Sequence, residues 1–193
     1  MTQEAVDQLV RVERMNVPTG DFVRSIHGRG LSGSPPWFDD VWNGVFDRIG
    51  RLGGAVPQDV ELGFHLCYSD YQHQRQVELA DASTLVRMAD AFTAVVPRRI
   101  DFLHLPVRED VDAGRYLAPL ADLALDPATE LYLGLITDRD GTDSAFSRIA
   151  TARRHIATFG IATECGIGRT PVESVPPLLQ IHRDASARRR PDE

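Results

Sequence analysis

The residues best suited to chemistry begin with an H-x-C pair, His65 and Cys67, in the segment GFHLCYSD. In an extended strand, residues two apart point to the same face, about 7 Å apart along the chain. Two such side chains can bind one ion, and a thiolate with an imidazole favours zinc among the common divalent metals. The pair alone is weak evidence, because a packed cysteine beside a hydrogen-bonded histidine is the more common arrangement.

Two further residues strengthen the metal interpretation. Cys165, in ATECGIGR, is the only other cysteine of the chain, and His104 lies in IDFLHLPV. Both fall at or near the carboxyl end of an expected strand, where the ligands of parallel α/β proteins converge. We therefore expect zinc held by His65, Cys67 and Cys165. His104, Asp101 or water would complete the coordination, although His104 is equally compatible with a packed core histidine.

Three other residues are candidates for catalysis at the same edge: Asp70, Asp138 and Arg169. A carboxylate can act as general acid or base, and the planar fork of an arginine can bind a carboxylate or a phosphate. Each also has a structural interpretation, as a solvated turn residue for the two aspartates and as part of a tight turn for Arg169.

The elements that position these residues form a regular series. From residue 60 onward, short apolar runs rich in strand formers alternate with amphipathic segments of helical period. The runs cover residues 60–68, 99–107, 129–137 and 160–167. Pro119 and Pro127 make the segment between the second and third runs less regular. Strands that alternate with helices predict an α/β fold with a parallel sheet. A further helix is expected from residue 37.

The length of the chain limits how much of a barrel it can form. A closed (β/α)8 barrel takes about 250 residues, with about 200 near the lower limit, so four strand–helix units predict a (βα)4 half of a TIM-type barrel. We assign residues 37–193 to this half-barrel and residues 1–36 to an N-terminal arm and loop. Such a sheet has two exposed edges and one exposed face. We expect a homodimer or a partner chain to complete the barrel; alternatively, helices from residues 1–56 cover the open face.

The motifs HLCYSD, TELYLGL and FGIATECGIGR, in this order, resemble the C-terminal half of the catalytic barrel of the cobalamin-independent methionine synthase family. This family shares its barrel with uroporphyrinogen decarboxylase, and the similarity covers roughly residues 37–183. An H-x-C pair, a glutamate on the next strand and a late cysteine bind zinc in the family. The resemblance implies zinc ligands at His65, Cys67 and Cys165. His104 stands where the glutamate is expected, and Thr137 where family members carry a proton-donating histidine.

Composition excludes several classes of function. The chain has 193 residues, of which 42% are hydrophobic and 25% charged, as in ordinary globular domains. A net charge of -7 disfavours nucleic-acid partners. All 21 basic residues are arginine, which excludes a Schiff-base lysine and a Walker-type lysine. No apolar run approaches the roughly 18 residues of a membrane span, and the polar N-terminus predicts a cytoplasmic protein with no membrane partner.

Together these observations predict a zinc-dependent enzyme acting on a small-molecule substrate. It would activate a thiol or a polar group for methyl transfer or for a diverged reaction. Two alternatives remain. One is a non-catalytic or partner-dependent subunit of a split barrel, and the other is a metal-free lyase, hydrolase or cyclase of the decarboxylase-like branch.

Overall fold

A computed structural model of the chain describes residues 12–18, 40–68, 70–71, 74–75, 78–164 and 167–187. Its centre is a parallel sheet of five strands in the order β1-β2-β5-β6-β7. The strands are β1 (Val12–Pro18), β2 (Glu61–Cys67), β5 (Phe102–Pro106), β6 (Glu130–Ile136) and β7 (Gly160–Thr163). The prediction of an α/β fold with a parallel sheet is confirmed, and the last four strands lie inside the four predicted runs.

The described helices follow the strands as the sequence pattern indicates. They are α3 (Val41–Ala55), α4 (Ser83–Val95), α5 (Ala113–Leu117), α6 (Gly141–Ala152) and α7 (Val175–Ala187). A proline near its start gives the 3₁₀ turn η1 (Ala118–Asp122) directly after α5, which explains the irregular segment between the second and third predicted runs. Two more 3₁₀ turns, η2 (Ile167–Arg169) and η3 (Val172–Ser174), precede α7. A short antiparallel hairpin, β3 (Asp70–Tyr71) and β4 (Gln74–Arg75), follows β2.

The strand β1 corrects the interpretation of residues 1–36 as an arm and loop only. Val12–Pro18 pairs along its whole length with β2 and forms one edge of the sheet. Its sequence, VERMNVP, mixes β-branched valines with Glu, Arg and Asn, so the local propensity for a strand is weak. Pairing with a neighbouring strand therefore decides its structure, and such long-range pairing leaves no local signature. The rest of residues 1–36 lies outside the described residues.

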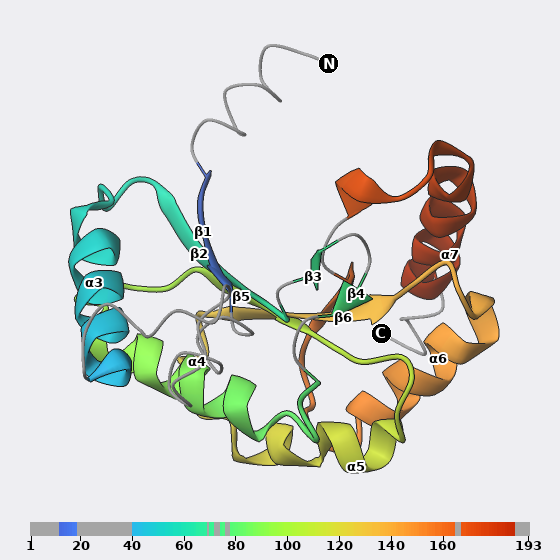
Figure 1. The fold of residues 1–193 in the computed structure, drawn as a ribbon, viewed down its shortest axis with the longest axis horizontal. Coiled ribbons are helices and arrows are strands. Elements are labelled where there is room, and N and C mark those ends of the chain that lie inside the picture. The colour runs from blue at the N-terminus through green and yellow to red at the C-terminus, as the bar shows by residue number, and fades with distance from the viewer. Residues whose placement is uncertain are drawn as a thin grey trace.

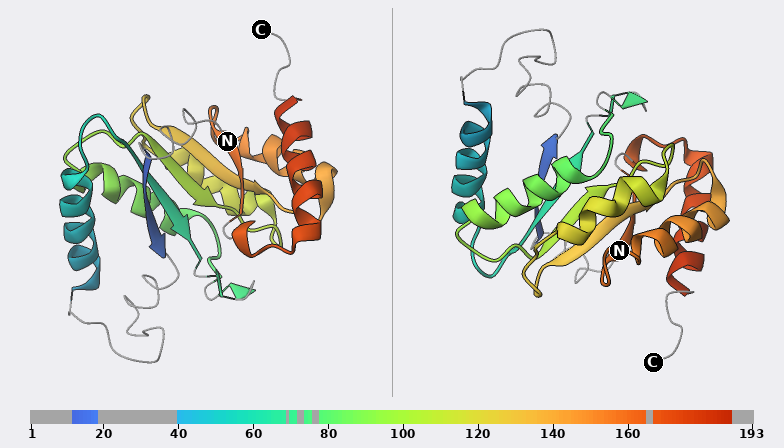
Figure 2. Two further views of the ribbon diagram at one scale, coloured as in Figure 1. Left: turned by 90° about the horizontal axis from the view of Figure 1, so that it is seen from above. Right: turned by 90° about the horizontal axis from the view of Figure 1, so that it is seen from below.

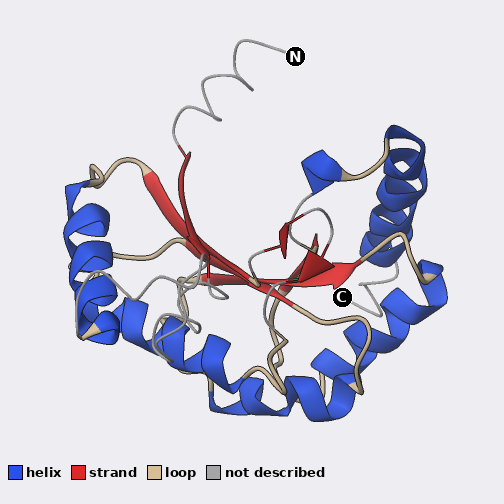
Figure 3. Cartoon of the chain, viewed as in Figure 1, coloured by secondary structure: helices blue, strands red, loops and turns tan. Residues whose placement is uncertain are grey.

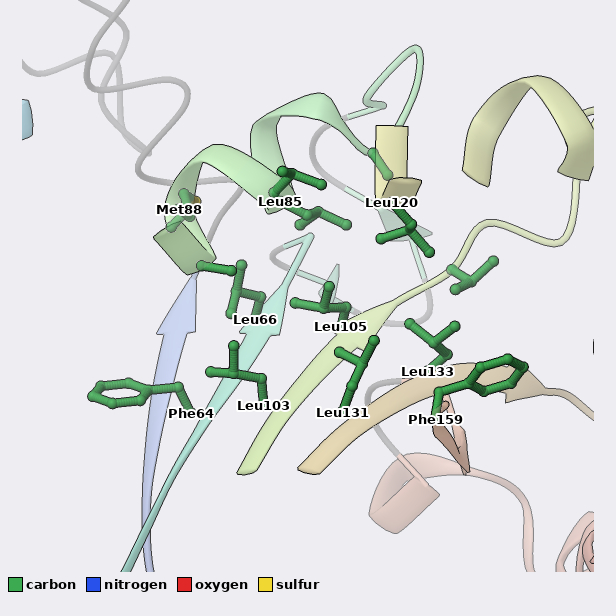
Figure 4. Close-up of a cluster of buried hydrophobic side chains, with 14 of the residues drawn as sticks. Phe64, Leu66, Leu85, Met88, Leu103, Leu105, Leu120, Leu131, Leu133 and Phe159 are labelled. Carbon is green, nitrogen blue, oxygen red and sulfur yellow. The ribbon is translucent and has the colours of Figure 1, made fainter. Parts of the chain in front are cut away.

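One face of the sheet is packed against helices. Figure 1 and Figure 3 show a curved sheet whose convex side carries α3, α4, α5 and α6. Figure 4 shows the leucines of the strands gathered with side chains of α4 on this side. The core there includes Leu66, Leu85, Met88, Leu103 and Leu133, each nearly or fully buried. Burial of these side chains is the main force that holds the helices on the sheet.

The opposite, concave side is called the open face here. None of the described helices crosses it, as the two further views show (Figure 2). The proposal that helices from residues 1–56 cover it does not hold for α3, because Phe46 of α3 packs at a tilt against Phe92 of α4 on the convex side. No helix in the described ranges combines the length and apolarity needed to cross a bilayer.

Candidate metal and catalytic site

Two histidines lie side by side on the open face. His65 of β2 and His104 of β5 are register partners on neighbouring strands, so their side chains leave the sheet at the same level. Their Nδ1 atoms are 2.7 Å apart, and their rings stack with centroids 4.6 Å apart at 27°. One Nδ1 donates a proton to the other, so the pair shares one proton at this contact. Sequence analysis proposed both residues but could not show that they touch.

Gly134 of β6 provides the room that the His104 ring occupies. A side-chain carbon on Gly134 would stand 3.3 Å from Nε2 of His104 and 3.1 Å from the carbonyl oxygen of Thr163. The same point is 3.4 Å from Cα of Glu164. The imidazole of His104 and the carboxyl end of β7 therefore converge above one glycine.

Two more glycines of the open face lie under aromatic rings. A side-chain carbon on Gly63 would overlap the ring of Phe102, and one on Gly160 would overlap the ring of Tyr132. The two rings meet edge to face, with centroids 6.3 Å apart at 90°. They line a groove of about 630 Å³ that reaches His104. A filled barrel has layers of bulky aliphatic side chains at this level, so the open face is hollow by comparison.

Cys67 is the last residue of β2 and lies two residues after His65, on the same face of the strand. Its side chain is buried, with 6% of the residue exposed. The next residue, Tyr68, fixes this end of the strand, because its hydroxyl donates to the carbonyl oxygen of Pro106 at 2.7 Å and also hydrogen-bonds the hydroxyl of Tyr116. Tyr68 was not proposed from the sequence, and it positions Cys67 relative to β5.

The donor types of this site fit zinc, since imidazole nitrogen and thiolate sulfur are its preferred ligands. Two nitrogens bound to one tetrahedral zinc ion are about 3.3 Å apart, as follows from bonds of about 2.0 Å. His65 and His104 are closer than this and are hydrogen-bonded to each other, so a bound ion would replace that hydrogen bond. Within the part of the chain that the structure describes, no three His, Cys, Asp or Glu side chains form a metal-binding group. Cys165 lies outside the described residues.

A charged cluster lies at the carboxyl ends of three adjacent strands. Arg139, in the turn after β6, forms ion pairs with Glu109 after β5 and with Glu164 after β7. Its contact with Glu164 is 2.6 Å long, and the side chain of Glu109 is only 12% exposed. None of these three residues was predicted from the sequence. The one feature of the sequence that could have indicated this cluster is that a charged residue closely follows each of these strands.

The three catalytic candidates have different outcomes. Asp138 lies exposed in the turn after β6, at the carboxyl edge where it was expected. Asp70 belongs to the hairpin strand β3, and Arg169 is the last residue of η2. The side chains of Asp70 and Arg169 lie outside what the structure describes.

The position and contacts of Asp101 do not support a role as a metal ligand. It lies just before β5, at the amino edge of the sheet, and its carboxylate accepts the backbone N–H of Leu62 at 2.7 Å. Arg98 and Arg99 also donate to it, at 3.5 and 2.6 Å. These contacts tie two strand beginnings together, so the role of Asp101 is structural.

Arg108, directly after β5, has a similar structural role at the carboxyl edge. Its guanidinium donates two hydrogen bonds to Asp110, at 3.0 and 2.8 Å, and one to the carbonyl oxygen of Leu79. The hydrogen bond with Asp110 raises the pKa of Arg108 above its usual value. The contact with Leu79 fixes the chain that returns from the hairpin toward α4.

No protein-family model matches this sequence, and no curated protein matches it. The resemblance to the methionine synthase barrel therefore rests on the three motifs quoted above.

Proposed function

We propose that this protein is a zinc-dependent enzyme that activates a thiol or a polar group of a small substrate, either for methyl transfer or for a diverged reaction. The observation that carries the proposal is the contact between His65 and His104, with Cys67 two residues along the same strand and face. Imidazole and thiolate donors converge here near the carboxyl ends of parallel strands, where such folds place their sites.

In this proposal His65, Cys67 and Cys165 would hold the ion, and His104 would be a fourth ligand that the substrate or water replaces. Zinc, when bound, lowers the pKa of a coordinated thiol or water so that it ionises near neutral pH. The stacking of the two histidines fixes the orientation of both rings. Asp138 at the exposed rim is proposed to exchange protons with the substrate, and Asp70 and Arg169 are proposed for the same rim.

Metal content tests the proposal directly. We expect about one zinc ion per chain by mass spectrometry in protein purified without chelator. Cys67→Ser and His65→Asn should both lose the metal, because each removes a proposed ligand. His155→Asn, in the turn after α6, is the matched control and should keep it. Wild-type protein without metal, or zinc retained in both ligand variants, would contradict the proposal.

We also propose that a second half-barrel, from another copy or a partner chain, completes the open face. Three features support this: the curved parallel sheet, the helices α3, α4, α5 and α6 on its convex side with no described helix across the concave side, and the hollow groove along Phe102 and Tyr132. Light scattering after size exclusion tests self-association. A molar mass of two chains supports completion by a second copy, and a stable single chain would exclude it.

A metal-free enzyme remains the second candidate, and the cluster of Arg139, Glu109 and Glu164 favours it, because carboxylates and an arginine are the groups that such chemistry uses. Activity on any substrate that persists after complete removal of metal would support this candidate over the zinc enzyme.

A further inference from the structure

Arg139 joins the ends of three consecutive strands. One arm of its guanidinium contacts Glu109, five residues after His104, and the other contacts Glu164, the residue that follows β7. Arg139 itself lies three residues after the end of β6. The three residues are called the Arg139 clamp below. It spans the carboxyl edge from β5 to β7.

The clamp is connected to the candidate metal site through Glu164. The backbone N–H of Glu164 donates to the carbonyl oxygen of Ile136 at 3.2 Å. Cα of Glu164 and Nε2 of His104 both lie within 3.4 Å of the same point above Gly134. The end of β7 is therefore a neighbour of the His104 ring. In the sequence, Glu164 directly precedes Cys165.

The charges explain why the arginine is needed. The Glu109 side chain is 12% exposed and that of Glu164 is 27% exposed, so water screens neither carboxylate fully. A partly buried carboxylate is unfavourable unless a cation compensates it. Without Arg139, both carboxylates would lose the cation that they share, and the ends of β5 and β7 would lose the ion pairs that join them. A lysine supplies one charge without the rigid two-armed fork, so it can replace the arginine only in part.

We propose that Arg139 is a positioning residue: by clamping Glu109 and Glu164, it holds the carboxyl end of β7 beside His104 and thereby sets the geometry of the metal site. This inference rests on the proposed zinc function and deepens it. Arg139 binds neither metal nor substrate in this role.

Cobalt spectroscopy tests the inference. Cobalt(II) is added to metal-free protein, and the absorption bands of the bound ion report its thiolate ligands. Arg139→Gln should weaken cobalt binding by about ten- to hundredfold, the usual effect of losing a group that orients a ligand, and should reduce the thiolate band. Arg139→Lys should restore both in part. Arg99→Gln, which removes an arginine from a carboxylate at the amino edge, is the matched control and should leave the spectrum unchanged.

A second measurement needs no metal. In a Cys67→Ser background, Cys165 is the single thiol of the chain, and its rate of reaction with a disulfide reagent reports how firmly this end of β7 is held. Adding Arg139→Gln or Glu164→Gln should raise that rate severalfold, whereas adding Arg99→Gln should not. The Glu164 variant breaks the same ion pair, so it serves if Arg139→Gln fails to fold.

The outcomes separate the two proposals. Absence of cobalt binding in the wild type would contradict the zinc proposal. The thiol reaction rates would then show by themselves whether Arg139 holds the end of β7 in place. Equal thiol rates with and without Arg139, or a cobalt spectrum unchanged in Arg139→Gln, would overturn the positioning role.

Discussion

Gly134 is the residue of the open face that leaves room for two neighbours, because His104 and the end of β7 both pack against it. Gly134→Ala would place a methyl group in contacts tighter than ordinary packing, so one of these neighbours must move. We expect a loss of about 1–3 kcal/mol in the free energy of unfolding and weaker metal binding. Urea unfolding and zinc competition with a chelator measure the two effects.

The control for Gly134→Ala is Gly168→Ala, since a side-chain carbon there meets no atom of the described residues within 4 Å. Its effect on unfolding should stay within about 0.5 kcal/mol. Equal stability and equal zinc affinity of the two variants would show that His104 does not depend on the space above Gly134.

At residue level, the sequence pointed to candidate residues but not to their contacts. His65, Cys67 and His104 follow from motifs and from the expected strand ends. Their contact depends on the register of β2 against β5, which no local pattern specifies. The same holds for Arg139 and Glu109, whose pairing joins two loops 30 residues apart. Tertiary structure alone brings such pairs together.

At the level of elements, α6 is fixed to the sheet by a buried arginine. Arg148 donates to the carbonyl oxygen of Leu135 at 2.9 Å and pairs with both carboxylate oxygens of Asp140. Arg148→Leu should cost about 1–3 kcal/mol, because the buried carbonyl and the carboxylate lose these partners. Urea unfolding measures the cost. The exposed Arg153 provides a control, and Arg153→Leu should change little.

The helix α7 should respond to pH through His182. Burial lowers the pKa of this histidine below its ordinary value. Below about pH 6.5, His182 therefore binds a proton more readily in the unfolded chain than in the folded chain. The free energy of unfolding should fall as pH decreases from 7.5 to 5.5. Thermal unfolding at both pH values measures the fall, and His182→Gln should reduce it. An identical pH dependence in the variant would contradict this origin.

Regular elements were predictable because their apolar periodicity is local. The runs that became β2, β5 and β6 match within a few residues. The helix α4 begins at Ser83, whose N–H donates to the carboxylate of Asp81. Hydrogen bonds from the side chain and then from the backbone N–H of Ser83 hold the pKa of Asp81 below its usual value. β7 ends four residues before the predicted end of its run, at Thr163, since apolar content alone does not mark where pairing stops.

For the whole molecule, the open face is the surface through which we propose that the protein assembles. Ala162 of β7 lines the groove there, whereas Leu179 of α7 is 52% exposed. If the open face is an interface, Ala162→Arg should shift the wild-type assembly toward single chains, and Leu179→Arg should not. Light scattering measures both. An unchanged molar mass for Ala162→Arg would place the interface elsewhere.

The strands β1, β2, β5, β6 and β7 follow one another across the sheet in the order in which they follow one another along the chain. No described strand of this sheet is inserted between two earlier ones. Each new strand therefore finds its only earlier partner already synthesised, and the sheet can grow strand by strand as the ribosome releases it. Because of this order, a gene could be divided at any crossover and each piece would still encode strands that are neighbours in the sheet. A barrel assembled from separately encoded pieces requires this property.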